Sequence, residues 1–257
     1  MPELPEVEIH ARNLRAWLEG RVIRGCEVLD PKLQSPSAAA PLPAALWERQ
    51  VLRVRRLAKY LLVDLDDAAT LVAHLRMTGR FVRDTYIAGP AGKPTRLCLE
   101  LDTGERVRFE DTRRFGRVWT APTARVTELS ELTRVGPDAL LEPIAPERLD
   151  AACRRTGRSI KALLMDQSLL GGLGNICAIE LLFRAGIAPA TPARSLTQAQ
   201  VTELALDIPR YLEWAIDAQS RRELVYLGEK GAENVFPIYR RQGEPCPRCE
   251  TPIRYGA

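Results

Sequence analysis

The feature that most constrains the fold is a change of hydrophobic period about halfway along the chain. Between residues 22 and 122 the apolar residues come in short alternating or β-branched runs, whereas from residue 146 onward they recur at helical spacing. The first pattern is typical of half-buried strands and the second of amphipathic helices. A further helical pattern occupies residues 5–18. The sequence therefore predicts an α+β protein: an N-terminal two-sheet antiparallel β-sandwich with a flanking helix, and a C-terminal helical domain.

The two patterns are separated by a polar, proline-containing stretch around Gly136-Pro137, which is typical of a linker. We predict a first domain at residues 1–133, a linker at 134–147, a helical domain at 148–232 and a last segment at 233–257. Asp102-Thr103-Gly104 between two strand runs predicts a hairpin turn. A chain of 257 residues, 46% of them hydrophobic, is long enough for two modest cores.

The net charge and the positions of the arginines say little about which class of molecule the protein binds. The net charge is +4, but arginines cluster in RVRR at 53–56, in RRFGR at 113–117, and as pairs at 154, 221 and 240. This clustering permits a nucleic-acid partner without requiring one. No apolar run approaches the roughly 20 residues of a membrane span, and the charged N-terminus is no signal peptide. We expect a cytoplasmic monomer without a membrane partner.

The first eight residues, MPELPEVE, suggest a reactive chain terminus. If Met1 is removed, as is usual before a small residue, Pro2 becomes a free secondary amine. An α-amino group has a pKa of about 8, so part of it is unprotonated at neutral pH and can attack an aldehyde carbon. Glu3 lies beside this amine and can move protons. Alternatively, Pro2 and Pro5 only stiffen a helix start, where the neighbouring glutamates are favoured by the helix dipole.

Several polar or exposed-looking residues interrupt the strand region. Lys59 lies within the apolar run LAKYLLVDL and His74 within HLRMTG, and each has an ordinary explanation: a lysine that extends to solvent and a satisfied core histidine. Met77, Arg113 and Phe115 lie in HLRMTG and DTRRFG. A flexible apolar side chain, an arginine and an aromatic ring at loop tips are suited to replacing a base extruded from a duplex. The alternative places Met77 and Phe115 in the core and Arg113 in solvent.

The string GGLGN at 171–175 predicts a tight turn between two helices. Asn175 would begin the second helix, whose free N–H groups and positive dipole end suit a phosphate. The alternative is a glycine-rich helical hairpin that binds nothing.

The six cysteines fall into two classes. Four lie in apolar patterns and are expected to be reduced core thiols: Cys26, Cys98, Cys153 and Cys177. Cys246 and Cys249 form a CxxC, but only ETPIRYGA follows, without a second such pair. Because structural zinc takes four ligands, we expect an incomplete site that holds zinc weakly.

Together these motifs resemble the formamidopyrimidine-DNA glycosylase (Fpg/MutM) and endonuclease VIII (Nei) family. The resemblance rests on MPELPEVE, KYLL, HLRMTG, DTRRFG and IKALLMDQSLLGGLGNICAIELLFRAGI, and it covers nearly the whole chain. HLRMTG and DTRRFG are more similar to the Fpg branch. The resemblance implies a bifunctional DNA glycosylase and abasic-site lyase of base excision repair, which removes oxidised purines (8-oxoguanine, formamidopyrimidines) from double-stranded damaged DNA. No cofactor is required for that chemistry.

The resemblance also implies roles for single residues. Pro2 is the nucleophile that forms a Schiff base, Glu3 shuttles protons, and Lys59 contacts a phosphate near the lesion. Further implied DNA contacts are His74, Met77, Arg113, Phe115, Lys161 and Asn175. GGLGN belongs to a helix-two-turn-helix, and Cys246 and Cys249 are the first half of a β-hairpin zinc finger.

Two alternatives stay open. A Nei-like enzyme would remove oxidised pyrimidines, and a non-catalytic protein would bind damaged duplex DNA without cleaving it. In Fpg proteins, the region that covers the extruded base usually has a glycine- and threonine-rich sequence. Residues 220–245 differ from that sequence. The sequence therefore leaves the preferred lesion open.

Overall fold

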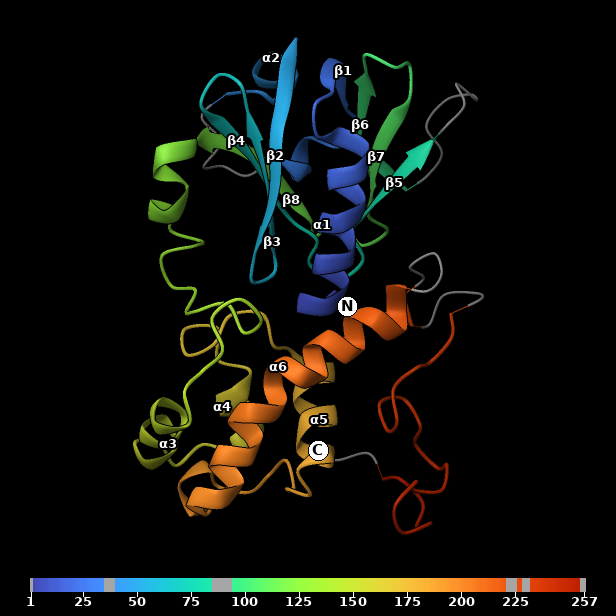
Figure 1. Cartoon of the computed structure of the whole chain (residues 1–257). Coiled ribbons are helices and arrows are strands. Elements are labelled where there is room, and N and C mark those ends of the chain that lie inside the picture. Colours follow the sequence, from blue (N-terminus) through green and yellow to red (C-terminus); the bar gives the residue numbers. More distant parts are fainter. Residues whose placement is uncertain (1, 35–39, 85–93, 221–225, 228–231, 255–257) are drawn as a thin grey trace. The chain divides into compact units, whose positions relative to one another are not determined.

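The computed structural model describes residues 2–34, 40–84, 94–220, 226–227 and 232–254. Met1 and the arginine pair at 221–222 lie outside these ranges. The chain forms two compact units, one of residues 1–2 and 6–133 and one of residues 3–5 and 134–257. Figure 1 shows strands in the first unit and helices in the second. In the described part of the chain, no helix is long and apolar enough to span a membrane.

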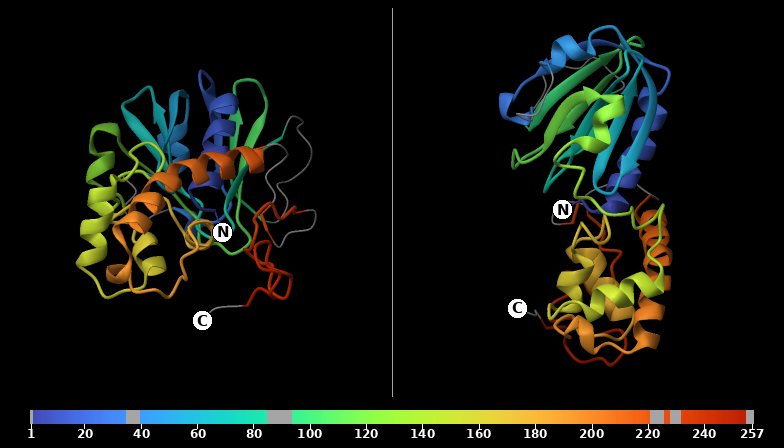
Figure 2. Two further views of the ribbon diagram at one scale, coloured as in Figure 1. Left: turned by 60° about the horizontal axis from the view of Figure 1, so that its bottom comes forward. Right: turned by 90° about the vertical axis from the view of Figure 1, so that its left-hand side faces the viewer.

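The first unit is the predicted antiparallel β-sandwich. Its eight strands pair in the order β5-β7-β6-β1-β2-β3-β4-β8. Only two residue pairs join β1 to β2, so the strands divide there into two halves of four. Both halves contribute side chains to one buried apolar core. Figure 2 shows the strands of this unit from two further sides. The strands are β1 (Val22–Val28), β2 (Arg49–Leu57), β3 (Tyr60–Leu65), β4 (Ala69–His74), β5 (Arg80–Asp84), β6 (Thr95–Leu101), β7 (Arg106–Glu110) and β8 (Arg117–Pro122).

Helix α1 (Leu4–Leu18) fills the same core. Val7, Leu14 and Leu18 are buried on one stripe, as their helical spacing predicts. The helix is followed by Gly20 with a φ of 79°, a conformation that glycine adopts without strain. Short helices α2 (Leu42–Leu46), η1 (Pro31–Leu33) and η2 (Thr123–Glu128) complete the unit.

The turns between strands correct one sequence prediction. Lys59 does not lie inside a strand: β2 and β3 form a hairpin whose last pair is Leu57 with Tyr60, and Lys59 is at its tip beside Ala58, which has a φ of 50°. In the sequence, the end of β2 and the start of β3 read as one apolar run, so the pattern does not show the turn between them. By contrast, the hairpin predicted at 102–104 is confirmed, with Gly104 at a φ of 79° between β6 and β7.

The second unit consists of helices followed by a short hairpin. Its helices are α3 (Pro146–Arg154), α4 (Ile160–Leu164), α5 (Asn175–Arg184), η3 (Ala193–Ser195) and α6 (Gln198–Ser220). Helix α6 is continuous across Pro209. Near the end of the described chain, Cys246 N–H donates to Thr251 C=O and Ile253 N–H to Glu244 C=O, which closes the hairpin.

A buried ion pair fixes α1 to the sheet. Nε of Arg56, whose side chain is 1% exposed, lies 2.8 Å from Oε2 of Glu8. Burial by itself raises the pKa of Glu8, but Arg56 and the flanking Arg15 and Arg12 outweigh it, so that the pKa is lowered. The charge on Glu8 is therefore paired with three arginines, of which Arg56 is the buried one.

We expect Arg56→Met to lower the free energy of unfolding by about 3 kcal/mol, because it removes the buried partner of Glu8 and leaves that carboxylate only the more exposed Arg12 and Arg15. Arg12→Met is the matched control, since Arg12 pairs with the same carboxylate but its side chain is 55% exposed. Its loss should stay below about 1 kcal/mol. Urea unfolding of both variants measures the difference, and equal losses would show that burial of the pair is unimportant.

Candidate functional site

The carboxylate of Glu3 caps helix α5. Glu3 is fully buried, and its oxygens accept hydrogen bonds from the N–H of Ile176 at 2.8 Å and of Cys177 at 3.0 Å. These N–H groups belong to the first helical turn, where no residue of the helix itself can accept them. The positive end of the helix dipole also favours a negative group. Glu3, directly after the buried Pro2, is thus held by main-chain groups of fixed geometry.

The glycines of GGLGN make room for this terminal segment. A Cβ on Gly174 would lie 2.3 Å from Cδ of Glu3, and a Cβ on Gly172 would lie 2.4 Å from Cδ1 of Leu4. The carbonyl of Gly172, which has a φ of 113°, accepts a hydrogen bond from the N–H of Leu4 at 3.1 Å. The expectation that the first N–H groups of α5 are free for a phosphate is therefore corrected: two of them hold Glu3.

A residue that sequence reasoning missed braces this turn. Gln167 accepts a hydrogen bond from the N–H of Gly172 at 3.0 Å, and its Nε2 donates to the carbonyls of Leu173 at 2.7 Å and Met165 at 2.9 Å. One side-chain amide thus satisfies main-chain groups on both sides of the turn. Its signal in the sequence is weak, an amide in the polar segment DQS ahead of the glycines.

Lys161 and Asn175 lie on the helices that flank the turn. Lys161 is in α4, and Asn175 is the first residue of α5; both are partly exposed. Among the described residues neither side chain has a hydrogen-bond or ion-pair partner. Both are therefore available to a ligand, although Asn175 does not lie beside an empty helix end.

Lys59 and His74 come together where β3 begins and β4 ends, in the first unit. Tyr60, next to Lys59, pairs with His74 across β3 and β4, and the two rings meet edge to face at 4.6 Å. Nδ1 of His74 accepts the N–H of Arg76 at 2.9 Å, which leaves Nε2–H as a donor. Burial, together with the charges of Arg76 and Lys59, lowers the pKa of His74 to about 3. At neutral pH His74 is uncharged, and the positive charge at these strand ends comes from Lys59 and Arg76.

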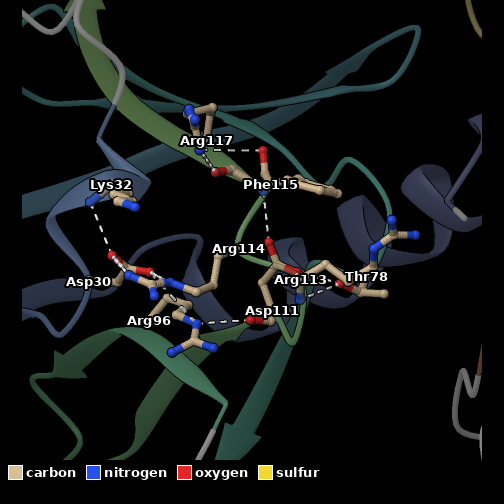
Figure 3. A network of polar contacts seen from close by, with 10 residues as sticks. Asp30, Lys32, Thr78, Arg96, Asp111, Arg113, Arg114, Phe115 and Arg117 are labelled. Atoms are coloured by element: carbon tan, nitrogen blue, oxygen red, sulfur yellow. Dashed lines mark hydrogen bonds and ion pairs between the residues drawn. The ribbon is translucent and has the colours of Figure 1, made fainter.

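A buried carboxylate joins the two segments that contain Met77, Arg113 and Phe115. Asp111, 1% exposed, accepts hydrogen bonds from the Thr78 hydroxyl, from the N–H of Arg113 at 3.1 Å and from the N–H of Gly116 at 2.7 Å (Figure 3). The turn of residue 77 and the loop of residues 112–116 are therefore held to one anchor. Sequence reasoning missed Asp111, although an Asp at a strand end before a loop is a common anchor.

The same loop exposes the residues suited to opening a duplex. Phe115 is 48% exposed, so the alternative that placed it in the core is wrong. The guanidinium of Arg113 lies over the Phe115 ring at 5.0 Å from its centroid. Met77 is partly exposed. The exposed side chains of Arg113 and Phe115 thus present a cation beside an apolar ring.

Glu180 and Arg248 attach the CxxC hairpin and the segment before it to α5. Glu180, which is fully buried, accepts the N–H groups of Ile238 at 3.0 Å and Tyr239 at 2.7 Å. Arg248 donates to the carbonyl of Arg184 at 2.7 Å, at the C-terminal end of the helix, and stacks on Phe183. The attachment uses no metal ligand.

Cys246 and Cys249 supply only two thiols to any zinc site. Hydrogen bonds from Thr251, followed by one from Cys246, lower the pKa of Cys249. Within the described ranges, no group of three or more His, Cys, Asp or Glu side chains is placed to hold a metal. The described residues therefore do not complete a tetrahedral site.

Comparisons with known families cover most of the chain. Residues 1–118 match the model of the formamidopyrimidine-DNA glycosylase N-terminal domain, and residues 135–223 match that of the formamidopyrimidine-DNA glycosylase H2TH domain.

Individual relatives and solved structures agree with these models. The chain is 38% identical to a formamidopyrimidine-DNA glycosylase of Pelotomaculum thermopropionicum, over 97% of this chain and 91% of that protein. It is 40% identical to one of Chloroflexus aurantiacus, over 98% and 91%. The Lactococcus lactis Fpg in complex with DNA containing an abasic site superposes with a TM-score of 0.88 at 28% identity, over 98% and 93%. The Thermus thermophilus MutM (Fpg) structure gives 0.82 at 35%, over 98% and 92%.

We expect Gly174→Ala to lower the free energy of unfolding by about 1–3 kcal/mol, because the added methyl group overlaps Glu3. The control is Gly157→Ala, since a Cβ at Gly157 meets nothing within 4 Å. That change should stay within about 0.5 kcal/mol. Thermal unfolding compares the two, and a fully stable Gly174→Ala protein would contradict the packing of Glu3 against the turn.

His74 should remain the neutral Nε2–H tautomer from pH 8 to pH 5, because its pKa is lowered to about 3. Its unfolded pKa is about 6.5, so the unfolded chain takes up a proton first and stability falls as the pH drops below that value. NMR of ring-labelled histidine measures the protonation, with His74→Gln to separate its signal from that of His10. A midpoint near 6.5 in the folded protein would contradict the neutral state of His74.

Proposed function

Because the chain belongs to the formamidopyrimidine-DNA glycosylase family, and is thus a DNA glycosylase of base excision repair, we propose that it excises oxidised purines from duplex DNA through a Schiff base on Pro2. The proposal includes cleavage of the resulting abasic site by β,δ-elimination.

The placement of Glu3 is the observation that carries this proposal. If the glutamates served only to begin α1, Glu3 would be solvated near the start of that helix. Instead its carboxylate is buried and bound to the first turn of α5, 173 positions away in sequence from Ile176. An acid fixed this firmly beside the chain terminus is suited to serve a reaction there.

The reaction begins at the Pro2 nitrogen once Met1 has been removed. The nitrogen attacks C1′ of the damaged nucleotide; a nitrogen–carbon bond forms and the glycosidic bond breaks. The base leaves with the bonding electrons and takes up a proton. The sugar ring opens, and an iminium links Pro2 to C1′. Successive proton losses from the sugar then expel the 3′ and 5′ phosphates.

Glu3 moves the protons in this scheme. A carboxylate has about four lone-pair sites, and α5 occupies two of them. The same carboxylate exchanges a proton with the sugar ring oxygen. The two main-chain hydrogen bonds hold the group in position while it does so.

The remaining residues bind and open the duplex. Met77, Arg113 and Phe115 fill the space of the extruded base, which is consistent with the exposure of Phe115. Lys59 and Lys161 donate charged hydrogen bonds to phosphates. His74 and Asn175 add neutral donors to the same backbone.

Borohydride should trap the protein covalently on abasic-site DNA, because reduction makes an iminium permanent. Pro2→Gly should reduce the trapped fraction sharply, since a primary amine at a flexible residue replaces the secondary amine. Gel electrophoresis measures the adduct and peptide mapping locates it. Full trapping in Pro2→Gly through a lysine would overturn the assignment.

Glu3→Gln is the companion variant in this experiment. Its shape is similar, but it carries no exchangeable carboxyl proton, so it should lose more excision of 8-oxoguanine than cleavage of a ready-made abasic site, where no base has to leave. Intact-protein mass establishes first that Met1 is absent from each preparation.

A further inference from the structure

Arg114 lies between Arg113 and Phe115 but has a different environment. Its Nε and Nη2 donate to Oδ2 and Oδ1 of Asp30 at 2.6 and 2.9 Å, a bidentate ion pair. Figure 3 shows the Arg114 side chain directed toward Asp30 and away from Phe115. The two arginines of the RRFG motif are therefore turned to opposite sides of the loop.

Asp30 is a rigid partner. It is 3% exposed and caps η1 by accepting the N–H of Lys32 at 3.1 Å. The guanidinium of Arg96 lies 4.0 Å from it and donates to the carbonyl of Asp111 at 2.8 Å. Hydrogen bonds from Arg114 are the main reason that the pKa of Asp30 is lowered, so it stays charged at neutral pH. The pair ties the loop to a fixed point on the sandwich.

The main chain at Arg114 needs such a restraint. Its φ is 60°, in the left-handed region that a residue with a Cβ adopts at a penalty of roughly 1 kcal/mol or more. A conformation of this kind persists only where surrounding contacts enforce it. Asp111 enforces it from one side through the N–H groups of Arg113 and Gly116, and Asp30 enforces it from the other.

We propose that the Asp30–Arg114 ion pair is a positioning device that orients Arg113 and Phe115 for insertion into the duplex, an inference that rests on the proposed function. Arg114 then contributes no phosphate contact of its own. Holding the loop before DNA binds reduces the ordering that binding requires. Small misplacements of inserted groups are expected to reduce the rate of the opened-duplex reaction strongly.

The test uses Arg114→Asn, because asparagine tolerates a positive φ and the variant therefore removes the ion pair without adding strain. Asp30→Asn removes the same charge pair from the other side and can still accept the N–H of Lys32. Arg125→Asn is the control, since it breaks an exposed pair with Glu128, at 3.1 Å, in the same unit. Arg114→Lys retains the charge and should recover part of the activity.

Two rates are measured for each protein: excision of 8-oxoguanine from a duplex, and strand cleavage at an abasic site in a single-stranded oligonucleotide, where no base has to be replaced. We expect both Asn variants to lower the duplex rate by roughly tenfold and the single-strand rate by less than about twofold. The double variant should be no slower than either single one, because both remove one interaction. Amide exchange of residues 111–116 without DNA should become faster in both.

The results distinguish a failure of the positioning role from a failure of the proposed function. Duplex and single-strand rates that fall equally, or unchanged exchange and rates in Arg114→Asn, would overturn the positioning role. A wild-type protein that cleaves neither substrate would instead overturn the proposed function. Normal thermal stability of the Asn variants, together with the expected rate pattern, supports positioning over a general loss of folding.

Discussion

The hydrogen bonds between Glu3 and the first turn of α5 are the constraint on which the site depends. The first N–H groups of a helix need acceptors, and a buried carboxylate needs donors. The hydrogen bonds between α5 and Glu3 satisfy both groups. The glycines at 172 and 174 follow from this contact, since any side chain there would occupy the space of Leu4 or Glu3. Gln167 in turn supports the glycine turn through its main-chain groups.

Buried carboxylates play the same part elsewhere in both units. Asp111 holds the main chain around Arg113, and Glu180 holds the irregular segment that leads to the CxxC hairpin. In each case an acidic side chain inside the protein binds main-chain N–H groups from a loop. Such bonds are strong where water is excluded, because the alternative is an unsatisfied polar group. They give irregular loops, such as the one that exposes Arg113 and Phe115, a fixed geometry.

The distribution of charge is more informative than its sum. Many arginines are neutralised locally, as in the bidentate pairs of Arg55 with Asp64 and of Arg184 with Asp207. Although the net charge is modest, some cations have no ion-pair partner among the described residues and can bind a ligand; Lys161 is an example. His74 adds a donor without a charge, because its half-buried position beside Arg76 and Lys59 disfavours protonation.

The sequence by itself determined the features that depend on neighbouring residues: the strand and helix periods, the stripe of Val7 and Leu14 on α1, the hairpin at 102–104, and the family through its motifs. Tertiary structure alone decided that Lys59 is at a hairpin tip, because two adjoining strand ends read as one apolar run. It also decided that Glu3 occupies the first turn of α5, and that Asp111 and Asp30 bind the loop of residues 112–116. These outcomes depend on partners distant in sequence: Asp30 is 84 positions from Arg114, and Glu3 is 173 from Ile176. No local pattern encodes such a pairing, because burial and hydrogen bonding are settled only when the chain has folded.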